Sequence, residues 1–154
     1  ADKARGAAAT IYVTGSYWFS AAPMAASLAT LKMVRETDYL ERTQALGERL
    51  RSGLDEAATR HGFALRQTGP AVMPLIMFDD DPGLGKGYLW NDSLMKRGVY
   101  FHPWHNMFIC AAMTEKDIDD TLQASDEAFK IVRDAGAIPP VEKLAVLSKI
   151  ANAD

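Results

Sequence analysis

Apolar residues recur at helical spacing in two long segments, and this pattern constrains the fold more than any other feature. In residues 38–60, leucines at positions 40, 46, 50 and 54 fall on one face. In residues 114–135 the corresponding face consists of Ile118, Leu122, Ser125, Phe129 and Val132. Thr114 followed by Asp117 predicts the N-terminal cap of the second helix. Each helix must therefore bury one side against another layer of structure.

Short runs of β-branched and aromatic residues alternate with these helices. They predict strands at 10–14, 63–67, 72–78, 99–101 and 108–112. Residues 23–35 and 88–97 predict two further helices, and Pro74 restricts its strand to a sheet edge or a bulge. The order of elements predicts an α+β fold, in which helices cover one face of a mainly antiparallel sheet.

Charge and composition exclude several classes of protein. The formal net charge is -3 and positive residues do not cluster, so we expect no nucleic-acid partner. The longest apolar run, 72–78, is far shorter than the ~20 residues that cross a bilayer, so we expect no membrane segment. The single cysteine, Cys110, cannot form an internal disulfide, and no secretion signal is visible, which together favour the cytoplasm. Cys110 lies in an apolar run and is expected to be a small buried hydrophobe.

The chain opens without methionine, in an alanine-rich segment that resembles the interior of a helix. This opening predicts a fragment of a longer protein.

The loop at 102–106 is the first candidate for function. Two imidazoles, an indole and an amide stand together there, from His102, Trp104, His105 and Asn106. They suit a substrate-facing loop, since binding residues concentrate on loops held by rigid elements. Two surface histidines beside a packed tryptophan are an equally plausible reading. A zinc site that also used Cys110 is disfavoured, because Pro103 prevents the regular helix that would bring the histidines together.

Two glycine-containing segments are candidates for binding a phosphate group. In residues 79–87, Asp80 occupies the position of the first P-loop glycine and Gly87 the position of its Ser or Thr, so we expect a solvated turn. The sequence Thr14-Gly15-Ser16 ends a predicted strand before a helix, where hydroxyl and backbone N–H groups suit a phosphate. No nucleophile and base stand in a pattern that supports acyl transfer.

Three segments taken together resemble one enzyme family. They are residues 12–31, which begin YVTGSYW and continue with PMAA and LATL, residues 97–103 (RGVYFHP), and residues 111–119 (AAMTEKDID). Their order and spacing resemble the class III pyridoxal-phosphate (PLP) aminotransferases, a family that includes the glutamate-1-semialdehyde aminomutases. The resemblance covers nearly all of the chain and implies the C-terminal third of a fold-type-I enzyme.

The resemblance also implies a division of the chain. Residues 1–22 would end the PLP-binding large domain, and residues 23–61 would form the connecting helices. Residues 62–135 would form the small C-terminal α+β domain, and residues 136–154 a tail helix.

In this family a Thr or Ser binds the phosphate of the partner subunit's cofactor. Ser16 is the matching position and Thr14 the second choice, with Gly15 between them. The resemblance implies that Tyr17 and Trp18 line a site shared by the two subunits of a homodimer.

The resemblance implies that the loop of His102, Trp104, His105 and Asn106 forms a second wall of the substrate pocket. This pocket would take an amine and a keto compound. The lysine that holds the cofactor as a Schiff base lies upstream of Ala1 in the family, so Lys3 is not that lysine. The chain therefore supplies no catalytic residue of its own, and we expect it to be inactive alone.

The sequence departs from the family at one point, and the identity of the substrate therefore stays undetermined. Several relatives carry a charged residue in the loop that matches 102–107, and this sequence has neither Arg nor Glu there. The alternatives are a 1,2-aminomutase of the glutamate-1-semialdehyde type and a stand-alone, non-catalytic binding or dimerisation module.

Overall fold

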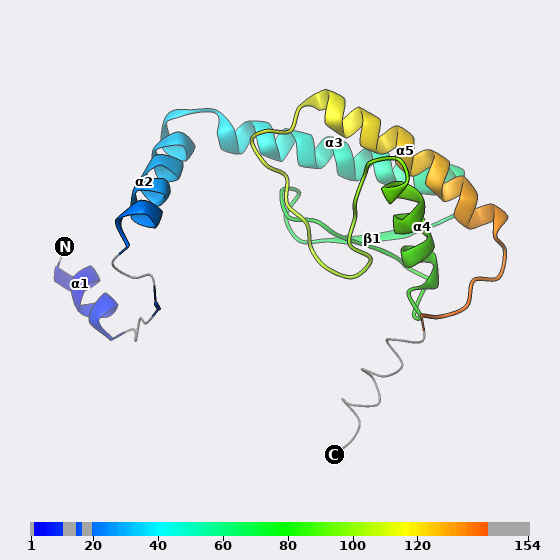
Figure 1. The fold of residues 1–154 in the computed structure, drawn as a ribbon, viewed down its shortest axis with the longest axis horizontal. Coiled ribbons are helices and arrows are strands. Elements are labelled where there is room, and N and C mark those ends of the chain that lie inside the picture. The colour runs from blue at the N-terminus through cyan, green and yellow to red at the C-terminus, as the bar shows by residue number, and fades with distance from the viewer. Residues whose placement is uncertain (1, 11–14, 17–19, 142–154) are drawn as a thin grey trace, which may run out of the picture. The chain divides into compact units, whose positions relative to one another are not determined.

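The computed structural model describes residues 2–10, 15, 16 and 20–141. The chain divides into two compact units, Ala1–Tyr39 and Leu40–Asp154. Figure 1 labels their helices and first strand, and each unit is considered by itself. Residues 11–14 of the first predicted strand, and the tail helix beyond Val141, lie outside the described residues.

The first unit contains α1 (Asp2–Ala9) and α2 (Ala21–Glu36). Helix α2 confirms the prediction for 23–35 and begins two residues earlier, with Pro23 in its first turn, where a missing N–H costs nothing. None of its residues is buried. Its long apolar side chains Met24, Leu28 and Leu31 are therefore left on the surface of the unit.

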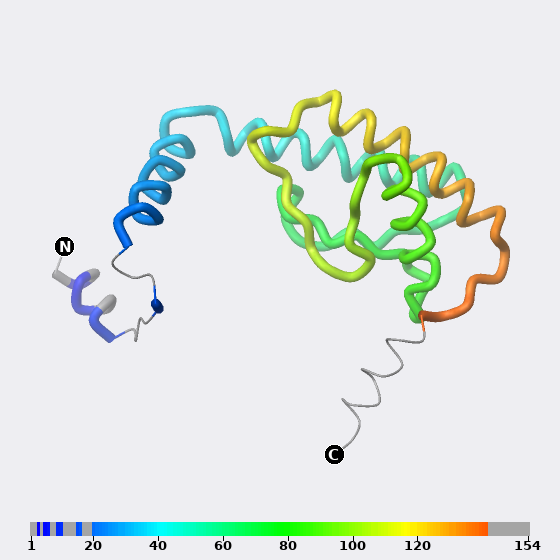
Figure 2. The backbone as a smooth tube through the Cα atoms, in the orientation of Figure 1, coloured from blue at the N-terminus to red at the C-terminus, as the bar shows by residue number. Residues whose placement is uncertain are grey.

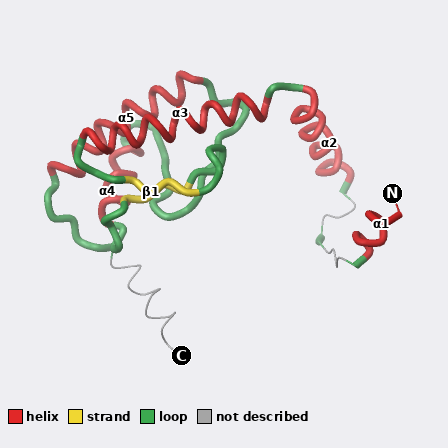
Figure 3. Tube along the Cα trace, turned by 180° about the vertical axis from the view of Figure 1, so that it is seen from behind, coloured by secondary structure: helices red, strands yellow, loops and turns green. Residues whose placement is uncertain are grey.

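The second unit consists of α3 (Tyr39–Arg60), β1 (Leu65–Thr68), β2 (Leu75–Phe78), α4 (Gly85–Met95) and α5 (Glu115–Asp134). The strands pair antiparallel, with Leu65 opposite Phe78 and Thr68 opposite Leu75. Figures 1 and 3 show α3 and α5 side by side, on the same side of the strands. Ion pairs Arg49–Asp119 and Arg60–Asp126 join the two helices. The α+β class is confirmed, with a two-stranded sheet among the described residues.

An aromatic cluster forms the centre of this unit. Phe129 of α5 is fully buried and stacks on Trp90 of α4, with ring centroids 5.1 Å apart. Phe78 of β2 meets both rings edge-on, at 5.8 Å from Phe129 and 6.0 Å from Trp90. Strand β2 and helices α4 and α5 thus each contribute a large ring to one point, and edge-on and stacked pairs of this kind add to the free energy of burial.

Local signals predicted the start of α5 and the glycines that follow α3, α4 and α5. Thr114 and Asp117 form the predicted capping box of α5. Its hydrogen bonds with Thr114 lower the pKa of Asp117. Gly62, Gly98 and Gly136 follow α3, α4 and α5 with positive φ angles of 82°, 81° and 66°.

Two predicted strands, 99–101 and 108–112, are wrong. Residues 98–113 form one irregular loop, which Figure 2 shows between α4 and α5. Its pairing with the chain before β2 consists of two backbone bonds, Met107 N–H to Pro74 O and Ile109 N–H to Val72 O. Pro74 has no N–H with which to continue a ladder.

The expectation that Cys110 is buried is also wrong. Cys110 is exposed, as is Phe108, while Ile109 between them is buried. The apolar run therefore presents alternate side chains to the core and to the surface, and only one face of it is covered.

Helix α4 begins at Gly85, inside the segment predicted as a polar turn. The Asp81 carboxylate accepts a hydrogen bond from Gly87 N–H at 2.8 Å and so satisfies a donor of the first turn. Lys86 bonds Asp80, and this contact lowers the pKa of the Asp80 carboxyl. The aspartates thus fix the start of α4 rather than stand free in a loop.

Candidate functional site

Ser16 is an exposed residue in a turn before α2, next to the exposed Gly15. An exposed hydroxyl beside a residue without a side chain suits a phosphate oxygen, because the ligand can approach the backbone closely. Thr14, Tyr17 and Trp18, the other residues expected here, lie outside the described residues. The assignment of Ser16 to a cofactor phosphate therefore stays a prediction.

The described lysines are not placed to hold a cofactor covalently. Lys86 bonds Asp80, and Lys32, Lys96, Lys116 and Lys130 pair with acidic residues on their own helices. Lys3 lies exposed on α1. Among the described residues, the chemistry that fits PLP is the hydroxyl and backbone of 15–16.

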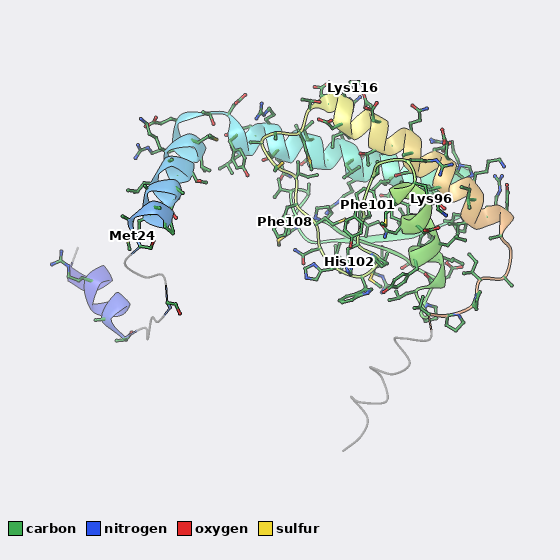
Figure 4. The ribbon with its side chains drawn as sticks, viewed as in Figure 1. Met24, Lys96, Phe101, His102, Phe108 and Lys116 are labelled. Atoms are coloured by element: carbon green, nitrogen blue, oxygen red, sulfur yellow. The ribbon has the colours of Figure 1, made fainter. Side chains whose placement is uncertain are left out.

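The loop at 102–106 is held at its base by the core. Val99 N–H bonds Leu94 O at the end of α4, and Phe101 stacks on Trp90 with centroids 5.2 Å apart. The buried Asn91 accepts the Phe101 N–H at 2.9 Å. Pro103 is also buried. The next residues consequently project from a rigid base (Figure 4).

The predicted substrate-pocket side chains of this loop gather into one cluster. The His102 and Trp104 rings meet edge-on, with centroids 4.6 Å apart and planes at 88°. The His105 ring centroid lies 5.6 Å from that of His102 and 6.3 Å from that of Trp104. Asn106 is half-buried beside them and offers its backbone carbonyl to His105. Their proximity is confirmed by the structure, and their role stays a prediction.

Hydrogen bonds favour one tautomer of each neutral imidazole. The Trp104 backbone N–H donates to His102 Nδ1 at 3.3 Å, so the proton of the neutral His102 ring stands on Nε2. His105 Nδ1 lies 2.9 Å from the Asn106 carbonyl oxygen, which can only accept, so this nitrogen carries a proton. The neutral rings therefore present a donor at His102 Nε2 and an acceptor at His105 Nε2.

Tyr88 joins the same cluster, although sequence analysis did not predict it. The Trp104 indole N–H donates to the Tyr88 hydroxyl at 3.1 Å. Tyr88 belongs to the first turn of α4 and stands 16 residues before Trp104. No motif joins the two positions, because only the packing of the loop against α4 brings them together.

A cavity of about 420 Å³ is lined in part by the two ends of the 98–113 loop. Its lining residues come from α3, α5 and the flanking parts of the loop, and include Leu50, Phe101, Met107, Ile109 and Ile118. Charged side chains, Arg97, Asp117 and Asp120, also line it. None of the predicted site residues that the structure describes is among its lining residues.

Within residues 2–10, 15, 16 and 20–141, no three His, Cys, Asp or Glu side chains come together as metal ligands would. Over the same residues, no helix combines the length and the apolar character needed to span a bilayer.

Comparison with known proteins finds aminotransferases. No family model matches the chain. An aminopentol aminotransferase of Sphingopyxis macrogoltabida is 53% identical over 140 residues, which are 90% of this chain and 33% of that protein. A glutamate-1-semialdehyde 2,1-aminomutase of Desulforudis audaxviator is 32% identical over 78% of this chain and 31% of its own length. The chain thus spans about a third of the length of the curated relatives it matches.

Solved structures give the same result for the fold. The FumI protein of Sphingopyxis sp. MTA144, solved in its PLP internal aldimine form, is 53% identical with a TM-score of 0.82. This match covers 91% of this chain and 34% of that one. A transaminase with PLP bound matches with a TM-score of 0.72 over 82% of this chain and 31% of its own, at 20% identity, and supports the fold alone.

Proposed function

Since the homologues of this chain are PLP-dependent aminotransferases and glutamate-1-semialdehyde aminomutases, we propose that it is the C-terminal third of an aminotransferase. The whole protein would transfer an amino group between an amine and a keto compound. The single observation that carries this proposal is the 53% identity to an aminopentol aminotransferase over 90% of the chain. The aminomutase activity is the second candidate, because those relatives match at 32% identity.

PLP, when bound, supplies an electron sink that lets an amino group pass between two carbon skeletons. In our proposal Ser16 donates its hydroxyl hydrogen to a phosphate oxygen of this cofactor, and Gly15 lets the phosphate approach the backbone. The exposure of both residues supports this role. The lysine that holds the cofactor would come from the part of the protein that precedes Ala1.

The loop of His102, Trp104, His105 and Asn106 would form one wall of the substrate pocket. Its support is geometric, because these side chains project together from a base fixed by Phe101 and Asn91. The name of the aminopentol relative denotes an amine that carries several hydroxyl groups. We propose an amine of this kind as the substrate.

We further propose that the protein acts as a homodimer in the cytoplasm. Helix α2 supports the first part, since Met24, Leu28 and Leu31 follow one another at helical spacing and are 43%, 69% and 65% exposed. Alanines at positions 25, 26 and 29 would allow a second copy to approach closely. The single cysteine, which favours a reducing compartment, supports the second part.

The test uses the complete natural protein that contains these residues. Purified with PLP, it should show the visible absorbance of bound cofactor and transfer the amino group of an amine to a keto acid such as pyruvate. The substitution Ser16→Ala should raise the dissociation constant for PLP at least about tenfold, the cost of one hydrogen bond to a charged group. Ser52→Ala, at an exposed position of α3, is the matched control and should leave it unchanged.

Absence of both bound cofactor and amino transfer would refute the proposal. Interconversion of the amino group within one substrate, without a keto acceptor, would assign the aminomutase activity instead. Equal PLP affinity of the Ser16→Ala and Ser52→Ala proteins would remove Ser16 from the cofactor site.

A further inference from the structure

Resting on the aminotransferase activity proposed above, we infer that Tyr88 and the His102–Trp104–His105 cluster form a subsite that recognises a hydroxyl group of the amine substrate. Tyr88 is the new member of this set. It belongs to α4, outside the loop that the sequence singled out.

Three hydrogen-bonding atoms of the cluster remain available to a ligand. Tyr88 accepts from the Trp104 indole, so its own hydroxyl hydrogen is left to donate. His102 accepts from the Trp104 backbone at Nδ1, which leaves Nε2–H as a second donor. His105 uses Nδ1 toward the Asn106 carbonyl, which leaves the Nε2 lone pair of the neutral ring as an acceptor.

The indole of Trp104 lies between these groups. It is 43% exposed, and its ring meets that of His102 edge-on, while its N–H is engaged by Tyr88. The exposed part of the ring is apolar and suits the C–H groups of a carbon skeleton. A flat apolar surface bordered by two donors and one acceptor matches a hydroxylated carbon chain.

The charge of the surroundings favours a hydroxyl over a carboxylate. Residues 98–113 contain no Asp, Glu, Lys or Arg. A carboxylate only accepts hydrogen bonds, and this loop has no Lys or Arg to bind it. A hydroxyl donates and accepts, and it therefore uses both kinds of group in the cluster.

Tyr88 is the most direct point of test, because Tyr88→Phe removes the hydroxyl and keeps the ring. In the complete holoenzyme, kcat/KM is measured for two amines, an aminooctanol with its hydroxyl on the carbon next to the amino carbon, and the matching aminooctane. We expect Tyr88→Phe to lower kcat/KM for the aminooctanol about three- to tenfold, the loss of one neutral hydrogen bond. For the aminooctane we expect no change.

Tyr100→Phe is the matched control. Tyr100 is 61% exposed on the same loop, and its ring meets that of His102 edge-on with centroids 6.3 Å apart. Its hydroxyl bonds no described residue and does not hold the Trp104 indole, so it should be dispensable for both amines.

Equal losses for both amines in the Tyr88→Phe protein would show that Tyr88 only holds the loop in place, and would overturn the inference. An unchanged aminooctanol reaction would overturn it as well. A wild-type protein that transfers an amino group from neither amine, and from no other amine, would instead refute the proposed function. The two failures are therefore distinguishable.

Discussion

The side-chain oxygen of Asn91 accepts a hydrogen bond from the Phe101 backbone N–H at 2.9 Å inside the core of the second unit. Asn91 is only 7% exposed, and Phe101 is equally buried. This bond joins α4 to the loop that carries His102 and Trp104. It occupies the backbone N–H that a strand at 99–101 would have used, which explains in part why that segment is irregular.

Replacement of Asn91 by leucine should destabilise the protein by about 1–3 kcal/mol, because the Phe101 N–H would remain buried without an acceptor. Asp92→Ala, at the next position of α4, is the control, since Asp92 makes a surface pair with Lys96 and should cost less than about 1 kcal/mol. Chemical denaturation of the two variants and the wild type measures the difference. Equal stabilities would show that the Asn91 bond contributes little.

Phe129→Ala should be among the most destabilising single substitutions in α5. The ring is fully buried and contacts Phe78 and Trp90, and loss of such a ring costs about 3–5 kcal/mol. Ile131→Ala, at a position 37% exposed on the same helix, should cost clearly less. Thermal unfolding followed by circular dichroism compares them, and similar losses would contradict the placement of the core at Phe129.

The ion pair between Arg60 and Asp126 should make stability depend on acid pH. The hydrogen bond from Arg60, assisted by one from His61, lowers the pKa of Asp126 below the ordinary value of 3.8, although partial burial opposes this shift. A lowered folded-state pKa stabilises the fold above the unfolded value, and this contribution is lost as the pH falls through the folded value. The stability difference between wild type and Asp126→Asn should therefore shrink below pH 3.8.

Urea unfolding at a series of pH values measures this difference. Asp55→Asn serves as the control, because Asp55 is exposed on α3 and forms no ion pair with the described residues. A difference between wild type and Asp126→Asn that stays constant into strong acid would refute the role assigned to the carboxylate.

Two glycines of α3 should respond differently to alanine. A Cβ at Gly47 would collide with the backbone carbonyl of Ala71, whereas a Cβ at Gly53 would meet the Leu122 side chain at 2.5 Å. The carbonyl cannot move without the chain, so Gly47→Ala should cost about 1–3 kcal/mol. The leucine can change its rotamer, so Gly53→Ala should cost less. Denaturation midpoints of the two variants measure these costs. A larger loss of stability for Gly53→Ala than for Gly47→Ala would contradict this account.

The proposed dimer can be tested at α2. Leu28→Glu combined with Leu31→Glu places two charges on its exposed apolar side, and should convert the complete protein from dimer to monomer in light scattering after gel filtration. Thr30→Glu, at an exposed position of the same helix, is the control for the effect of an added charge. A protein that remains dimeric with both glutamates would exclude α2 from the interface.

Much of the helical structure could be predicted from local sequence. The Thr114 and Asp117 pair determines the start of α5 through bonds within one turn. Glycines at 62, 98 and 136 end helices because they adopt positive φ at low cost. The strands at 99–101 and 108–112 were predicted wrongly, because a strand depends on a partner that its own sequence does not specify.

In the candidate site, too, some features follow from the local sequence and others only from the packing of distant segments. The sequence by itself determined that two imidazoles and an indole share one loop, and three of its segments resemble the class III PLP aminotransferases, among which the comparison also finds similar proteins. Only the tertiary structure decided that Tyr88 of α4 meets Trp104, that Asn91 holds Phe101, and that Cys110 is exposed. Caps and turns are formed by neighbours in the chain, whereas these contacts depend on how distant segments pack, which local residue patterns do not encode.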